Sequence, residues 1–123
     1  MATYYWMTRN RGNKYNNRKV EVDGRKFDSK KEARRYGELK LLLDAGEISD
    51  LHMQVAFELQ PKFYDEEEHR YQRAIKYVAD FVYLDKEGNK VIEDVKSPAT
   101  RQNAVYRLKK KMMAYRGWYI KEV

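Results

Sequence analysis

Two neighbouring stretches decide the fold of this chain: IKYVADFVYL at residues 75–84 and VIEDVK at residues 91–96. Both are rich in β-branched and aromatic residues, which favour strands. The five residues DKEGN at 85–89 separate them and are typical of a turn. We therefore predict an antiparallel hairpin in which Leu84 pairs with Lys90.

The predicted hairpin carries charged side chains among apolar neighbours. Counting back along its register places Asp80 opposite Asp94, and Lys96 follows two residues later on the same face. Like charges directly opposite each other destabilise a sheet, so this pair needs a compensating cation, for which a divalent metal is the natural candidate. Glu93 faces the other way and is expected at the surface.

A helix is predicted over residues 29–45, before the hairpin. Ser29 can cap its first turn, and Gly46 follows its last turn. Its buried stripe is expected to comprise Glu32, Ala33, Tyr36, Leu39 and Leu43. Glu32 thus offers a third carboxylate near the hairpin, although a capping box with Ser29 would also explain it.

The other signals are shorter. They are a tight turn at 23–24, a strand over 54–59 that stops at Pro61, an acidic loop at 65–68, a helix over 101–116 and a final strand over 118–123. The last helix shows an apolar stripe of Val105, Leu108, Met112 and Tyr115. Gln54 or Gln60 could approach the acidic site, but polar strand residues are more often exposed.

These elements predict an α/β fold with a mixed central sheet and the core order helix, three strands, helix, strand. The last strand should lie parallel to its neighbour, because a helix connects the two. Residues 1–19 are basic without an acidic residue, so we predict a basic arm followed by a single domain over 20–123.

Composition narrows the chemistry. The 123 residues include no Cys, which excludes disulfides, thiolate catalysis and cysteine zinc sites. Carboxylate oxygens suit Mg²⁺ or Mn²⁺. The net charge of +7 favours a polyanionic partner such as nucleic acid. No apolar run is long enough to span a bilayer, so we expect an intracellular protein without a membrane partner.

Together these observations indicate a metal-dependent phosphodiesterase. Asp80 and Asp94 would hold Mg²⁺, Lys96 would orient or deprotonate the attacking water, and Glu32 would add a supporting carboxylate. Alternatively, Asp94 and Lys96 form an ion pair on a solvated edge.

The combination of Asp80, Asp94-Val95-Lys96 and a helical Glu32 resembles the PD-(D/E)XK nuclease superfamily, with Ala79 standing where the family name has Pro. The run VDGRKFDSKKEA at 22–33 is similar to small phage-encoded members. The resemblance implies a restriction-endonuclease-like fold, metal ligation by Asp80, Asp94 and Glu32, and catalysis by Lys96. It further implies a Mg²⁺-dependent endodeoxyribonuclease related to Holliday-junction resolvases, a homodimer on branched DNA. Such a phage or prophage protein would act in the cytoplasm of the bacterial host.

The DNA contacts are expected from basic residues of the last helix and the arm. The expected set comprises Arg101, Arg107, Lys109, Lys110, Lys111, Arg9 and Arg11. An ordinary solvated face is the alternative for the helix. For the whole chain, the alternatives are a nicking or DNA-end endonuclease of the same fold, or a catalytically silent nucleic-acid-binding module.

Overall fold

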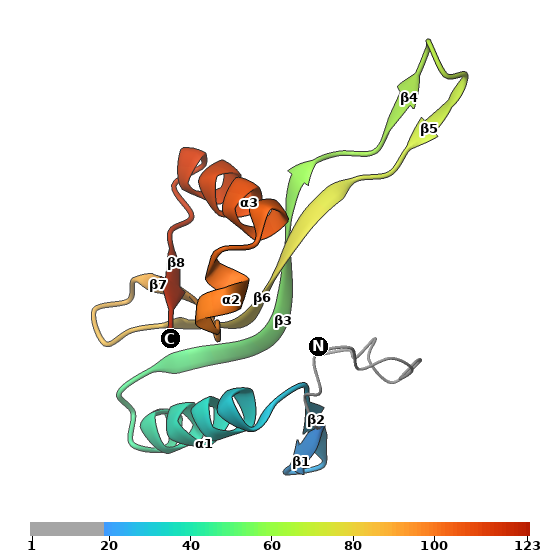
Figure 1. The fold of residues 1–123 in the computed structure, drawn as a ribbon. Coiled ribbons are helices and arrows are strands. Elements are labelled where there is room, and N and C mark those ends of the chain that lie inside the picture. Colours follow the sequence, from blue (N-terminus) through green and yellow to red (C-terminus); the bar gives the residue numbers. More distant parts are fainter. Residues whose placement is uncertain (1–18) are drawn as a thin grey trace.

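A sheet of four strands lies at the centre of residues 19–123, the part of the chain that the computed structural model describes (Figure 1). Strands β3 (Ser49–Gln60), β6 (Ile75–Leu84) and β7 (Lys90–Asp94) are antiparallel neighbours, and β8 (Ile120–Glu122) lies parallel to β7. The predicted α/β fold with a mixed sheet is confirmed. The predicted arm at 1–19 lies outside the described residues except for its last residue.

The register of the β6–β7 hairpin is the predicted one. Leu84 pairs with Lys90, and the regular pairing extends back to Phe81 and Glu93. Asp85 closes the five-residue loop, because its Oδ1 accepts hydrogen bonds from two backbone N–H groups of that loop. The next positions in register are therefore the two acids, Asp80 and Asp94.

The first helix, α1 (Lys30–Asp44), begins and ends as predicted. Ser29 Oγ accepts a hydrogen bond from the Glu32 N–H at 3.1 Å, and Gly46 follows the helix with a φ of +78°. A small hairpin precedes it, formed by β1 (Val20–Val22) and β2 (Arg25–Phe27). The two turn residues between these strands have positive φ, which is the geometry of a type I′ turn.

The C-terminal region departs from the single predicted helix. It forms α2 (Pro98–Arg101) and α3 (Ala104–Tyr115), because the Asn103 side chain accepts from the Tyr106 N–H and starts a second helix. Tyr106 and Met113 face the sheet. The apolar stripe noted in the sequence is mostly exposed: Val105 by 61%, Leu108 by 58% and Tyr115 by 91%.

The acidic loop at 65–68 is the tip of a hairpin that the sequence analysis missed. Strands β4 (Phe63–Asp65) and β5 (Arg70–Gln72) pair with each other and form a separate ribbon. Figure 1 shows this ribbon extending beyond the end of β3 and β6, away from the helices. None of the helices within residues 19–123 is long and apolar enough to cross a membrane.

The core consists of two clusters, because β3 and β6 are long enough to pack against α1 and also against α3. The α1 cluster comprises Phe27, Ala33, Tyr36, Leu39, Ile48, Met53, Phe81 and Tyr83. The α3 cluster comprises Phe57, Leu59, Tyr77, Ala79, Val82, Ile92, Tyr106 and Met113.

The expectation that Glu93 lies at the surface is wrong. Its side chain is fully buried, because α1 covers the face of the sheet toward which it points. Arg35 of α1 donates from Nε to Oε1 at 2.8 Å and from Nη2 to Oε2 at 2.6 Å, and the Tyr83 hydroxyl also donates to Oε2. Burial acts to raise the pKa of Glu93, but these hydrogen bonds outweigh it and hold the pKa below its ordinary value.

We predict that Arg35→Met lowers the free energy of unfolding by about 3–5 kcal/mol, because it leaves the buried Glu93 carboxylate without its hydrogen-bonded cation and with only the more distant Lys121, 3.9 Å away. Adding Glu93→Gln should recover much of this loss. Lys86→Ala removes an exposed ion pair with Glu47 and should cost at most about 1 kcal/mol. Denaturant unfolding at pH 7 measures all three. A loss from Arg35→Met no larger than that from Lys86→Ala would show that the buried pair does not hold the helix.

Candidate metal centre

The middle of β6 and the segment that follows β7 meet the N-terminus of α1 at a pocket of about 710 Å³. Acidic, basic and amide side chains from four parts of the chain line it, among them Asp28, Lys31, Glu32, Asp80, Lys96 and Asn103. The structure therefore brings together the predicted Glu32, Asp80 and Lys96 from separate segments, with Asp94 buried beside Asp80.

The Asp80 and Asp94 carboxylates each accept a hydrogen bond from the backbone of the neighbouring strand segment. The Asp80 N–H donates to Asp94 Oδ1 at 3.1 Å, and the Val95 N–H donates to Asp80 Oδ2 at 2.9 Å. These side-chain bonds occupy the place where the backbone ladder would continue. One oxygen of each carboxylate is thereby fixed. The other oxygen of Asp94, Oδ2, is buried and has no hydrogen-bond donor within residues 19–123.

Lys96 lies beside that unsatisfied oxygen. Its Nζ is 3.4 Å from Asp94 Oδ2, which makes an ion pair rather than a well-formed hydrogen bond. The ammonium also lies 4.5 Å from the centre of the Tyr106 ring, close enough for a cation–π contact. The side chain of Lys96 is 15% exposed, so this charge is confined at the edge of the pocket.

The chain's last strand supports the Asp-Val-Lys segment. The Val123 N–H donates to the Asp94 carbonyl at 3.0 Å, and the Lys96 N–H donates to the Val123 carbonyl at 3.1 Å. Lys31 of α1 adds a hydrogen bond from Nζ to the Lys96 carbonyl at 3.0 Å. Neighbours on both sides thus fix the backbone between the two charged side chains.

Gln54 belongs to this site, which the sequence pattern alone did not decide. It lies on β3 opposite Asp80, because its neighbours in the chain pair with the two residues that flank Asp80 on β6. Its φ of +55° is unusual for a residue other than glycine. Its Nε2 donates to Glu32 Oε2 at 3.2 Å and lies 3.4 Å from Asp80 Oδ1. The amide therefore bridges two acids. Gln60 lines a different pocket beside the β4–β5 hairpin.

The three acids are harder to ionise than usual. Burial, followed by the charges of Asp80 and Asp28, raises the pKa of Glu32 to about 8. Burial raises the pKa of Asp94 to about 6 despite the opposing charge of Lys96. Burial also raises the pKa of Asp80, although the Val95 N–H opposes it. A bound cation would favour the ionised form of these acids and so lower their pKa values.

The donor set fits a metal held by few protein ligands. Within residues 19–123, no three acidic or imidazole side chains converge closely enough to enclose an ion. Mg²⁺ commonly uses one or two carboxylates and retains several waters, and Asp80 and Asp94 are the neighbouring carboxylates that would supply such ligands. Glu32 is separated from Asp80 by the Gln54 amide and would act in support.

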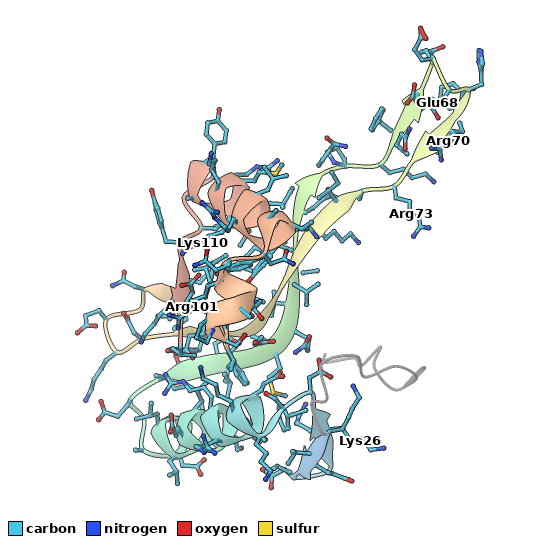
Figure 2. All side chains as sticks on the ribbon, viewed as in Figure 1. Lys26, Glu68, Arg70, Arg73, Arg101 and Lys110 are labelled. Atoms are coloured by element: carbon cyan, nitrogen blue, oxygen red, sulfur yellow. The ribbon has the colours of Figure 1, made fainter. Side chains whose placement is uncertain are left out.

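The basic residues expected to contact DNA divide into four groups. Arg101 and Lys110, labelled in Figure 2, form ion pairs with Glu122 at 3.6 Å and 2.9 Å. Lys109 Nζ donates to the Lys76 carbonyl at 2.9 Å. Two further residues of the expected set are exposed and form no ion pair with any residue from 19 to 123: Arg107 and Lys111. The last two, Arg9 and Arg11, lie outside the described residues.

The fold and pocket define a mixed α/β domain with a site lined by acids and two lysines. Residues 12–123 match the family described as "Protein of unknown function (DUF1064)", and the chain belongs to this family. No curated protein and no solved structure matches the chain.

We predict that Glu32→Gln stabilises the metal-free protein at pH 8 but not at pH 4.5. Because the folded pKa of Glu32 is about 8 and the model-compound value is 4.5, wild-type stability falls as pH rises between these values. Glutamine does not ionise, so the variant should be more stable at pH 8 by up to about 5 kcal/mol. Denaturant unfolding in EDTA from pH 4.5 to 8.5 measures the difference.

The control for this experiment is Glu87→Gln, which neutralises an exposed acid in the β6–β7 loop. Its difference from wild type should not change over the same pH range. A Glu32→Gln protein with the same pH dependence as wild type would contradict the raised pKa.

Proposed function

We propose that this chain is a metal-dependent DNA endonuclease of the PD-(D/E)XK type. The observation that carries the proposal is the placement of Asp80 and Asp94 side by side on adjacent strands, with Lys96 against Asp94 at a pocket. Burying two acids beside each other is costly, and a structural role alone would not require it. The buried Asp94 Oδ2 without a donor is the position that a cation would satisfy.

Asp80 and Asp94 would hold Mg²⁺, with Asp94 contributing Oδ2. When bound, this ion would polarise a phosphoryl oxygen and lower the pKa of a coordinated water. The two backbone N–H groups that bind the other carboxylate oxygens keep both acids oriented, so little reorganisation accompanies binding. Preorganisation of this kind supports catalysis rather than mere affinity.

Lys96 would act on the substrate phosphate or on the attacking water. Its ammonium is confined between Asp94 and the Tyr106 ring, and its backbone is fixed by Lys31 and Val123. A positive charge held there offsets negative charge developing on the phosphodiester. Glu32 would support this arrangement through Gln54, which hydrogen-bonds both Glu32 and Asp80.

DNA would approach along the rim of the pocket. Lys31 lines the pocket from α1, and Asn103 lines it from the start of α3. Arg107 lies one helical turn after Asn103 and is exposed, so it extends the same side of α3 away from the pocket. Arg101, on α2 beside this rim, and the arm residues Arg9 and Arg11 would add phosphate contacts.

The resemblance to PD-(D/E)XK nucleases supports the narrower parts of the proposal. An antiparallel β6–β7 hairpin, followed by helices and the parallel strand β8, is compatible with a restriction-endonuclease-like core. The same resemblance underlies the proposed preference for branched DNA, action as a homodimer and a role in phage-infected bacterial cytoplasm.

We predict that Asp80→Asn and Asp94→Asn each reduce Mg²⁺-dependent DNA cleavage by about 10²-fold or more, because each removes a charged ligand. Cleavage is measured on a four-way junction and on a linear duplex of matched sequence, with Mg²⁺ or EDTA. Calorimetric titration with Mn²⁺ provides a second measurement, in which both variants should lose binding. DNA affinity in EDTA should be unchanged or higher, because a negative charge near phosphate is removed.

Asp44→Asn is the matched control, because Asp44 is an exposed acid at the end of α1, outside the pocket. It should retain cleavage and metal binding. Equal cleavage of the linear duplex would retain the nuclease but remove the junction preference. DNA binding by wild type without any cleavage would favour the silent binding module. Cleavage that survives Asp80→Asn would overturn the assignment of the site.

A further inference from the structure

The β4–β5 hairpin leaves aromatic surface uncovered by residues 19–123. Phe63 is 44% exposed, Tyr64 44% and Tyr71 62%, and the two tyrosines pack edge to face at 5.2 Å. An isolated two-stranded hairpin is only marginally stable in water. This one is nevertheless well formed, because Asp65 accepts hydrogen bonds from two N–H groups of the turn and from the Gln72 amide. A preformed projecting ribbon with exposed aromatic rings is suited to docking.

The outer face of α3 leaves a second apolar surface uncovered by the described chain. Val105, Leu108 and Tyr115 are more than half exposed. Their spacing places Leu108 and Tyr115 on the helix side opposite Tyr106 and Met113, with Val105 at the edge of that side. Figure 1 shows α3 beside the part of β3 and β6 from which the hairpin extends.

The charges of these two surfaces are complementary. The hairpin tip is Asp65-Glu66-Glu67-Glu68. Among residues 19–123, the only ion pair of these four acids joins Glu68 to Arg70, both labelled in Figure 2. With about 3.6 residues per turn, Lys109 and Lys111 lie on either side of the apolar stripe of α3. Neither lysine forms an ion pair with a residue from 19 to 123. Lys111 is exposed, and Lys109 Nζ donates one hydrogen bond to the neutral Lys76 carbonyl at 2.9 Å, so neither positive charge is neutralised by an acid of the described chain.

We propose that the β4–β5 hairpin of one copy of this chain docks on the apolar stripe of α3 in a second copy. The aromatic rings of the hairpin would cover Leu108 and its neighbours, and the acidic tip would meet Lys109 and Lys111. A two-fold axis makes the exchange reciprocal, so each dimer contains two such contacts. Doubling a small contact brings it closer to the roughly 1,600 Å² that stable interfaces bury.

Other occupants fit these charges less well. DNA would be repelled by the four acids at the hairpin tip. The arm at 1–19 is basic and has no acid, so it would be repelled by the lysines that flank the stripe on α3. A second copy supplies an acidic, aromatic ribbon and a basic, apolar helix at the same time. The proposed contact does not depend on the nuclease chemistry.

Charge reversal with complementation tests this contact in the full chain. The hairpin variant is Glu66→Lys with Glu67→Lys, and the helix variant is Lys109→Glu with Lys111→Glu. Sedimentation equilibrium should show a wild-type dimer and a dissociation constant raised about 10-fold or more for each variant alone. In an equimolar mixture, the basic hairpin meets the acidic helix, and the unchanged acidic hairpin meets the unchanged basic helix. The mixture should therefore form a one-to-one heterodimer with near wild-type affinity.

A control separates a specific contact from overall charge repulsion. Asp44→Lys with Glu87→Lys makes the same change in net charge as the hairpin variant, at exposed positions elsewhere, and should leave the dimer intact. Circular dichroism and unfolding midpoints verify that every variant is folded.

A wild-type chain that stays monomeric would overturn the proposal, as would a dimer that neither variant weakens or a mixture that fails to associate. Loss of DNA affinity by the helix variant of a monomeric protein would assign the α3 surface to nucleic acid instead. Because the readout is association, failure here is distinct from failure of the metal site.

Discussion

The Arg35–Glu93 pair is the interaction on which the arrangement of the pocket depends. Side chains alternate along β7, so the strand presents Glu93 to α1 and the adjacent Asp94 to Asp80, which lines the pocket. Arg35 lies three residues after Glu32 on the same helix. One buried pair therefore fixes the distance between the segment that carries Glu32 and the strand that carries Asp94. Helix α1 thus covers the face of β7 that carries Glu93, and its first turn places Glu32 at the pocket.

The pocket concentrates negative charge where the protein has the least water to solvate it. The raised pKa values of Glu32 and Asp94 reflect the free-energy cost of ionising these buried acids. The backbone bonds to Asp80 and Asp94 orient these carboxylates but do not neutralise them, and Lys96 compensates only part of the charge. A structure that maintains this imbalance is suited to bind a cation and to lose much of the electrostatic penalty when it does so.

Elements governed by local patterns could be predicted from the sequence, and those governed by tertiary contacts could not. The loop length of the β6–β7 hairpin sets its register, and this alone placed Asp80 beside Asp94. The burial of Glu93 depends on which face α1 covers, which no strand pattern encodes. The sequence named Gln54 and Gln60 without deciding between them, and only the pairing of β3 with β6 brings Gln54 to Glu32 and Asp80. The β4–β5 hairpin lacks the alternation of a half-buried strand because both of its faces are largely exposed.

The position of β8 has a consequence for the order of events during synthesis. Val123 bonds the backbone on both sides of Val95, and β8 emerges from the ribosome after the other strands of this sheet. A nascent chain can pair β3, β6 and β7 early, since these strands are consecutive in the core. It cannot fix the segment between Asp94 and Lys96 until synthesis has passed residue 123. The segment that carries Val95 and Lys96 into the pocket is thus fixed only after translation of this domain, whereas most of the sheet can form earlier.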